Sequence, residues 1–318
     1  MAPRRPSSLG HILVTGANGF VGGHLLPRLR AAFPEARLTL CGQAAGMRQT
    51  DFADVAAVEA LVAATRPDAV LHLAAIAAIP AARRDPTLAW RINLGGTLAL
   101  ARGILATAPE ATLLYVSSAD IYGGSFHAGV ARDESALPAP ANTYAATKAA
   151  TDLALGAMVS EGLHVVRLRP FNHTGPGQSP DFVVPAFARQ VAAIAAGRQE
   201  PVLHVGALAP ERDFLDVRDV CDAYVAALAR RAELPAGCVL NIASGTPHRI
   251  GDVLAELMRL GGIGNARVET SAPLLRPGDL ARACGNAGRA RSLLGWAPRI
   301  PWEQTLRDVL ADWTARPG

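Results

Sequence analysis

The sequence has few cysteines and no long apolar stretch. Its 318 residues include four cysteines, which lie far apart and form no CxxC pair, so neither a disulfide framework nor a metal site is expected and a reducing compartment fits best. No segment has the ~18 uninterrupted apolar residues that a membrane helix needs. Residues 1–9 are basic and rich in Pro and Ser but contain no apolar signal region. We therefore expect a cytoplasmic protein with no membrane partner.

Charged residues are also few, and neither sign dominates. Half of the residues are hydrophobic, 18% are charged, and the formal net charge is +4. The excess of Arg is dispersed and forms no basic block, so we expect no nucleic-acid partner. This composition indicates a compact globular protein, and the length suggests two domains or one large α/β unit.

The stretch His11–Leu26 combines an apolar run, three glycines and a helical pattern, and it is the most informative part of the sequence. The apolar run Ile12–Val14 is typical of a strand buried on both faces of a parallel sheet. Gly16, Gly19 and Gly22 follow at intervals of three residues and lead into an apolar helical pattern. Glycines at this place allow a tight turn, the approach of a pyrophosphate to the backbone, and close packing of helix on strand. The pattern predicts a dinucleotide site at the start of a helix, and a glycine-rich turn without a ligand is the alternative.

The second predicted strand, Arg37–Leu40, bears on which cofactor is bound. An acidic residue is expected just beyond this strand when a 2′-hydroxyl is recognised, but the chain has Cys41, Gly42 and Gln43 there. Arg48 lies nearby and can meet a 2′-phosphate. The sequence therefore favours NADP(H), with NAD(H) possible and with Arg48 as an ordinary loop residue as the alternative.

The next predicted elements are a strand at Ala69–Ala75 and a long helix at Thr87–Thr107. The strand ends in small residues that leave room for a ligand at the crevice of the sheet. His72 within the strand is interpreted as a packed core residue, and Asn93 within the helix as a structural hydrogen-bonding group.

A polar group is predicted where a further strand, Leu113–Val116, ends. That strand delivers Ser118 and Asp120 to its carboxyl end, and a long loop to about residue 142 follows. The helix that begins at Thr143 places Tyr144 and Lys148 on one face, one turn apart. An ordinary exposed Tyr–Lys pair is the alternative.

These motifs carry a family resemblance. Thr15-Gly16-x-x-Gly19-x-x-Gly22, Ser118 and Tyr144-x-x-x-Lys148 resemble the extended short-chain dehydrogenase/reductase superfamily, within it the NAD-dependent epimerase/dehydratase group. Segments 169–192 and 211–224 look like the GDP-6-deoxy-4-keto-D-mannose reductases, relatives of GDP-mannose 4,6-dehydratase. Residues 276–280 and 293–313 fit the C-terminal part of the same group.

The resemblance implies a fold and a division of the chain. The expected class is α/β, with a Rossmann-type doubly wound parallel sheet and a smaller α/β C-terminal substrate domain. Residues 1–170, with a returning segment at about 212–232, form the dinucleotide-binding domain, and the remainder of 171–318 binds the nucleotide sugar. Helices 87–107 and 143–160 are expected to pair two copies into a homodimer.

The resemblance also implies a reaction and its residues. Tyr144 protonates the C4 ketone oxygen of a nucleotide-linked 4-keto-6-deoxy sugar, Lys148 lowers the pKa of the phenol, and Ser118 binds that oxygen. The substrate expected is GDP-4-keto-6-deoxy-D-mannose and the product GDP-D-rhamnose. The residues expected to bind the cofactor are Gly16, Asn18, Gly19, Phe20, Val21, Gly22, Arg48, Asp51, Phe52, Leu73, Ala74, Ala75, Tyr144 and Lys148. Those expected at the substrate are Asn172, Val183, Val184, Arg212 and Arg276.

Asp120 keeps other activities open. Dehydratases of the family have a Glu within two positions after the Ser/Thr, and this chain has Ala119 and then Asp120. This departure favours simple ketone reduction, although Asp120 can act as an acid or base, or cap a turn. The alternatives are a nucleotide-sugar 4-epimerase or 4,6-dehydratase with tightly bound NAD, or a non-catalytic dinucleotide-binding protein.

Overall fold

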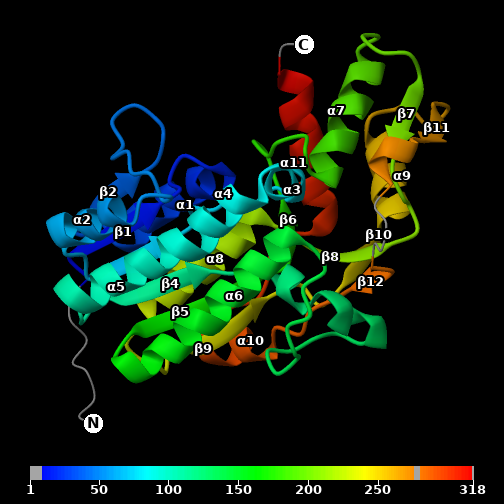
Figure 1. Ribbon diagram of the computed structural model, residues 1–318. Helices are drawn as coiled ribbons and strands as arrows, with labels where there is room; N and C mark the ends of the chain where they lie inside the picture. The colour runs from blue at the N-terminus through cyan, green and yellow to red at the C-terminus, as the bar shows by residue number, and fades with distance from the viewer. Residues whose placement is uncertain (1–8, 276–279, 317–318) are drawn as a thin grey trace.

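A six-stranded, wholly parallel sheet forms the centre of the molecule (Figure 1). The computed structural model describes residues 9–275 and 280–316. The strand order is β2-β1-β3-β4-β5-β9, which confirms the doubly wound α/β class. The strands are β1 (His11–Thr15), β2 (Arg37–Cys41), β3 (Ala69–His72), β4 (Thr112–Val116), β5 (His164–Pro170) and β9 (Cys238–Ile242).

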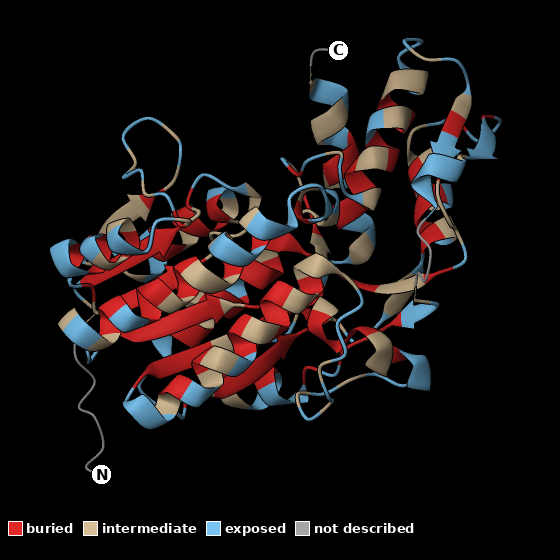
Figure 2. Ribbon diagram, in the orientation of Figure 1, coloured by how far each residue is buried: buried red, intermediate tan, exposed pale blue. Residues whose placement is uncertain are grey.

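Helices cover both faces of this sheet, as Figure 2 shows by the buried strands and the exposed outer sides of the helices. One face packs against α1 (Phe20–Ala32), α8 (Val217–Ala229) and α10 (Gly288–Leu294). The other packs against α2 (Val55–Thr65), α5 (Thr97–Thr107) and α6 (Thr143–Ala157). Among the described residues, no helix is long and apolar enough to span a bilayer.

A second lobe has its own apolar core (Figure 1, upper right). Strands β6 (Asn172–Thr174), β8 (Glu211–Asp216), β10 (Pro247–Arg249) and β12 (Arg282–Ala283) form one small sheet, and β7 (Val202–Val205) pairs with β11 (Arg267–Thr270). The helices of this lobe are α7 (Val183–Ala195), α9 (Ile250–Leu260) and α11 (Trp302–Ala315). The division of the chain into two domains stays a prediction, and the sixth strand of the large sheet, β9, lies beyond the returning segment at 212–232.

Two elements differ from the sequence prediction. β3 ends at His72 rather than at Ala75, because the ladder with β1 ends where Thr15 pairs with His72. The helix expected at 87–107 is divided into α4 (Pro86–Trp90), a π-helical segment (Arg91–Gly96) and α5. Shorter helical pieces complete the chain: α3 (Ile79–Arg84) and 3-10 segments at Ala119–Ala128, Met158–Glu161 and Ala272–Leu274.

Asp213 of β8 ties three segments together. Its fully buried carboxylate accepts hydrogen bonds from the Ser244 amide at 2.9 Å, the Ser244 hydroxyl at 2.6 Å, the Gly245 amide at 2.9 Å and the Gly285 amide at 3.1 Å. The turn after β9 and the segment after β12 are thereby fixed to β8. Burial raises the pKa of Asp213, and these hydrogen bonds act in the opposite direction.

Replacing Asp213 with Ala is expected to lower the free energy of unfolding by about 3 kcal/mol, because buried amide donors lose their acceptor. Urea denaturation measures this. The control is Asp222→Ala, which removes an exposed ion pair with Arg28 (2.7 Å) and should cost less than about 1 kcal/mol. Equal losses in the two variants would contradict the role given to Asp213.

Candidate active site

The glycine turn after β1 forms a cradle that side chains would fill. Gly16 has φ +69°, and a Cβ there would lie 2.8 Å from the Ala74 amide nitrogen. A Cβ on Gly22 would lie 2.3 Å from the Ala17 carbonyl oxygen. Gly19 is the N-cap of α1 and has no side chain to cap the first turn, so the free N–H groups of the helix can receive a phosphate. The cradle fits a dinucleotide pyrophosphate.

The loop after β2 lies beside this turn. Asn18 Oδ1 accepts a hydrogen bond from the Gln43 amide at 3.0 Å. The Arg48 amide donates to the Leu40 carbonyl at 2.8 Å and the Gly42 amide donates to the Arg48 carbonyl at 3.1 Å, so backbone bonds close the loop. The side chain of Arg48 is exposed, and this leaves its guanidinium accessible to a ligand.

Other residues expected at the cofactor have structural contacts. Asp51 is exposed and its carboxylate accepts from the Ala53 amide at 2.8 Å. Phe52 is buried, with its ring 5.4 Å from the ring of His72. Ala74 donates its amide to the Thr15 hydroxyl at 3.2 Å, which holds the chain after β3 against the glycine turn. Leu73, Ala75, Phe20 and Val21 are partly buried around the same turn.

Ser118, Tyr144 and Lys148 meet at the carboxyl end of β4. The hydroxyl of Ser118 lies within reach of the Tyr144 phenol and acts to lower its pKa. The Lys148 ammonium donates to the Val116 carbonyl at 2.6 Å. The Asp120 amide donates to Ser118 Oγ at 3.1 Å, which places Asp120 beside the cluster. The structure thus brings together the hydroxyl, the phenol and the ammonium that the sequence motifs singled out.

Burial shifts the pKa values of this cluster. Desolvation raises the pKa of Tyr144, the charge of Asp120 raises it further, and the hydrogen bond with Ser118 opposes them. Desolvation lowers the pKa of Lys148 to about 7, against the opposing charge of Asp152. In the free protein at neutral pH Tyr144 is therefore a phenol, and Lys148 changes charge within the physiological range.

A buried chain of hydrogen bonds joins the glycine turn to the helix of Tyr144. His72 bonds the Thr15 hydroxyl at 2.7 Å and the Thr97 hydroxyl at 2.9 Å. Thr97 donates to the Asn93 carbonyl at 2.7 Å, and the Asn93 side chain donates to Thr147 Oγ1 at 2.9 Å. Burial lowers the pKa of His72 to about 3, so the ring is neutral. The interpretation of His72 and Asn93 as structural residues is confirmed.

The residues expected at the substrate are spread along the second lobe. Asn172 is exposed at the start of β6. Val184 is buried in the core of the second lobe, whereas Val183 packs at its edge, so Val183 is the more accessible of the pair. Arg212 donates to the Leu280 carbonyl at 2.7 Å. Arg276 lies outside the described residues.

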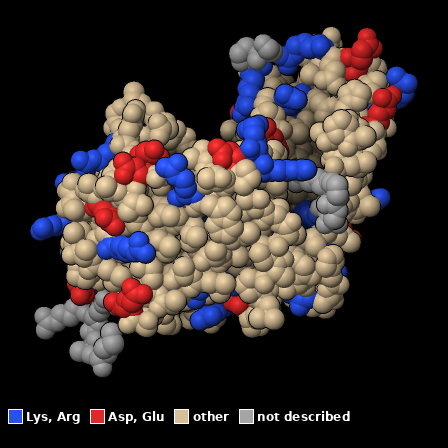
Figure 3. Space-filling view, in the orientation of Figure 1, with Lys and Arg blue, Asp and Glu red and all other residues tan. Residues whose placement is uncertain are grey.

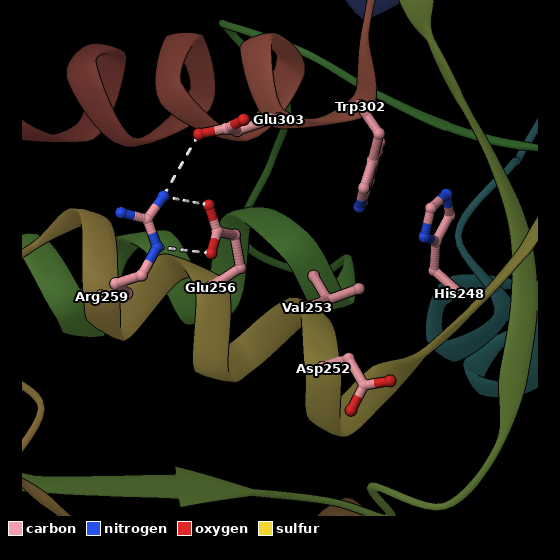
Figure 4. Close-up of a pocket in the computed structure, with 7 residues that line it drawn as sticks. All are labelled: His248, Asp252, Val253, Glu256, Arg259, Trp302 and Glu303. Atoms are coloured by element: carbon pink, nitrogen blue, oxygen red, sulfur yellow. Dashed lines mark hydrogen bonds and ion pairs between the residues drawn. The ribbon is translucent and has the colours of Figure 1, made fainter.

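A separate cavity of about 400 Å³ lies in the second lobe between α9 and α11 (Figure 4). It contains none of the residues predicted from the sequence. The Trp302 ring stacks on His248 with centroids 5.0 Å apart. Arg259 pairs with Glu256 at 2.6 Å and with Glu303 at 3.2 Å across the opening. The charges of this cavity are thus largely satisfied by one another.

A parallel sheet with a glycine cradle and a Ser/Tyr/Lys cluster at its carboxyl end defines an NAD(P)-dependent enzyme of the Rossmann type. Comparison with known proteins then identifies the group. The chain belongs to the NAD dependent epimerase/dehydratase family, whose model matches residues 12–243. The predicted resemblance is confirmed.

Within this family, the chain is similar to both a reductase and an epimerase of nucleotide sugars. The chain is 38% identical to GDP-6-deoxy-D-mannose reductase of Pseudomonas aeruginosa over 96% of this chain and 97% of the relative. The solved structure of RMD from P. aeruginosa complexed with NADPH is 35% identical, with a TM-score of 0.85 over 97% of this chain and 100% of that one. UDP-glucose 4-epimerase of Thermus thermophilus, in complex with NAD, is 27% identical, with a TM-score of 0.80 over 96% and 99%.

The pKa of Lys148 predicts how cofactor affinity depends on pH. Because that pKa is lowered to about 7, the ammonium is present below pH 7 and is lost above it. Affinity for NADPH should fall about tenfold as the pH rises through this range, as one charged hydrogen-bond donor is lost. Fluorescence titration of bound NADPH measures it.

Two variants control this prediction. Lys148→Met has no titrating group and should bind NADPH weakly at every pH, without the step that Lys148 gives the native protein. Lys148→Arg stays charged and should also lack the step. A native affinity that does not change across pH 7 would contradict the assignment of Lys148.

Proposed function

We propose that the protein reduces the C4 ketone of GDP-4-keto-6-deoxy-D-mannose to give GDP-D-rhamnose, with NADPH as the reductant. The observation that carries the proposal is the meeting of Ser118, Tyr144 and Lys148 at the same edge of the sheet as the glycine cradle. The full-length similarity to a GDP-6-deoxy-D-mannose reductase supports the choice of substrate.

The chemistry requires a hydride at the carbonyl carbon and a proton at its oxygen. Bound NADPH supplies the hydride. The Ser118 hydroxyl donates a hydrogen bond to the ketone oxygen and so orients the carbonyl. Tyr144 gives its phenolic proton to that oxygen. The Lys148 ammonium stabilises the phenolate that remains and binds the ribose hydroxyls next to the nicotinamide.

Burial and a neighbouring charge keep the proton on Tyr144 in the free protein. A reductase needs Tyr144 as a phenol before the reaction, and both burial and the charge of Asp120 raise the pKa of Tyr144. Oxidation of a sugar hydroxyl would need the phenolate instead. The charge of Asp120 thus helps to keep Tyr144 protonated.

A 4-epimerase or 4,6-dehydratase with tightly bound NAD is the second candidate. The likeness to an epimerase solved with NAD favours it. A dehydratase must also remove the C5 proton and expel the C6 hydroxyl, and Ala119-Asp120 replaces the Glu-containing pair of the family's dehydratases. A non-catalytic dinucleotide-binding protein would have no use for a phenol paired with a buried ammonium.

Residues on the surface favour NADP(H) as the cofactor and a substrate that carries a diphosphate. The residues directly after β2, Gly42 and Gln43, are not acidic. The accessible guanidinium of Arg48 suits a 2′-phosphate, and NAD(H) is the alternative. Figure 3 shows Lys and Arg side chains along the side of the second lobe that borders the hollow between the lobes. We propose that Asn172, Val183, Arg212 and Arg276 bind the nucleotide sugar, with the two arginines at the diphosphate.

We also propose that the protein is a cytoplasmic homodimer. The four cysteines are free and buried, in keeping with a reducing compartment. Helices α4 and α6 pack side by side, and both expose large apolar side chains: Trp90 is 38% exposed and Leu153 is 56% exposed. Apolar residues of this size on adjacent helices suit a helical contact between two copies.

The function is tested by mixing the protein with GDP-mannose, a GDP-mannose 4,6-dehydratase and NADPH. The loss of NADPH absorbance should match the ketosugar consumed, and the product should be GDP-D-rhamnose by NMR. A protein that retains NAD through purification and consumes no NADPH with GDP- or dTDP-linked ketosugars would favour the epimerase or dehydratase instead.

Tyr144→Phe is the matched control for this assay. Removing the proton donor should lower kcat about a thousandfold and leave NADPH affinity unchanged, because the phenol ring remains. Native turnover in this variant would exclude Tyr144 as the acid.

The dimer is tested by Leu153→Glu in sedimentation velocity. A charge within the α4–α6 face should turn the dimer into a monomer, because an unpaired carboxylate would be desolvated at the contact. Leu137→Glu, at a residue 78% exposed on a loop, is the control and should stay dimeric. A native monomer, or a Leu153→Glu dimer of native affinity, would contradict the proposed contact.

A further inference from the structure

A buried ion pair anchors the helix that carries Tyr144 and Lys148. Asp152 lies one turn beyond Lys148 on α6 and is fully buried. Arg169 of β5 donates two hydrogen bonds to this carboxylate, from Nη2 to Oδ1 at 2.8 Å and from Nε to Oδ2 at 3.1 Å. Arg169 itself is 4% exposed. This bidentate geometry fixes the rotation of α6 against the sheet.

Arg169 also reaches the segment that follows Ser118. Its Nη1 donates to the Tyr122 hydroxyl at 3.0 Å, and that hydroxyl donates to Asn241 Oδ1 of β9 at 2.7 Å. Tyr122 and Asn241 are fully buried. Ser118 is the N-cap of the 3-10 segment Ala119–Ala128, to which Tyr122 belongs. One guanidinium therefore contacts both elements that deliver the candidate catalytic groups.

We propose that Arg169 is a positioning residue, which holds Tyr144 and Lys148 on α6 in register with Ser118 and Asp120 on the turn after β4. The effect on turnover rests on the proposed reductase function, since it acts through those groups. The register itself does not depend on the substrate. Arg169 touches neither the cofactor cradle nor Ser118, and acts through Asp152 on one side and Tyr122 on the other.

The geometry requires arginine at this position. Three of its nitrogens donate toward the Asp152 carboxylate and the Tyr122 hydroxyl, and Nη1 also lies 3.4 Å from the Glu134 carbonyl. A lysine ammonium is a single point of charge and cannot span both partners. Arg167 offers the contrast: it also bonds Asp152 Oδ1, at 3.1 Å, but its remaining contacts are the Asp152 and Gly237 carbonyls. Arg167 secures α6 without reaching the turn.

The test compares Arg169→Lys with Arg167→Lys. Both changes weaken a buried contact of Asp152, and only the first separates α6 from the turn. Arg169→Lys should lower kcat for the ketosugar about a hundredfold, the scale of a displacement of about 1 Å among reacting groups. Its affinity for NADPH should fall by no more than the roughly tenfold change that loss of the Lys148 charge is expected to cost. Arg167→Lys should keep kcat within about threefold of native, whatever its loss in melting temperature.

Tyr122→Phe tests the same role if Arg169→Lys does not fold. The ring and the Asp152–Arg169 pair remain, and the two hydrogen bonds of the hydroxyl, with Arg169 and Asn241, are lost. We therefore expect kcat to fall by about tenfold. Crystal structures of the variants with NADPH give a readout that needs no substrate. The separation of Ser118 Oγ from the Tyr144 hydroxyl should grow in Arg169→Lys and Tyr122→Phe, and stay native in Arg167→Lys.

The outcomes separate the two proposals. If the native protein reduces no ketosugar, the proposed function fails and the positioning role is judged by the Ser118–Tyr144 separation. If Tyr122→Phe and every folded Arg169 variant keep the native kcat and the native separation, Arg169 is not a positioning residue. Equal losses of kcat in Arg167→Lys and Arg169→Lys would also overturn the inference, because they would reflect only a weakened core.

Discussion

The arrangement of the site depends on a neutral imidazole buried between two threonine hydroxyls. His72 joins Thr15, at the end of the strand before the glycine turn, to Thr97 at the end of the π-helical segment. A charged ring there would be desolvated and would lie near the Lys148 charge, and both effects lower the pKa of His72. Through Asn93 and Thr147 the same chain reaches α6. The cofactor cradle and the phenol are therefore fixed to one rigid body.

Local patterns predicted the parts of the site that are close in sequence. Gly16, Gly19 and Gly22 follow directly on a strand, and Tyr144 and Lys148 are one helical turn apart, so their relative placement follows from backbone geometry alone. The apolar runs of the central strands likewise predicted a sheet buried on both faces. The family resemblance supplied the rest of the interpretation, including the role given to Ser118.

Local sequence patterns could not predict contacts between segments that are distant in the chain. Nothing in the sequence around Arg169 indicates that its partners are Asp152 and Tyr122, because the pairing depends on how α6 and the turn pack on the sheet. The π-helical segment was also missed. The carbonyl of Asn93 within it accepts from the Thr151 hydroxyl of α6, a tertiary contact that a local pattern typical of regular helix does not contain. Val184 was expected at the substrate and instead packs in the core of the second lobe.

The two lobes are joined by groups that also border the candidate substrate region. Asp213 fixes the turn after β9 and the segment after β12, and the adjacent Arg212 bonds the Leu280 carbonyl. Side chains alternate across a strand, so consecutive residues of β8 place one group in the core and the other toward the opposite face. Since the carboxylate of Asp213 locks the backbone of β8, the direction of Arg212 is set by the same contacts that hold the lobes together. In the proposed binding mode, this joint presents Arg212 to the diphosphate as a preformed partner rather than one that must be ordered on binding.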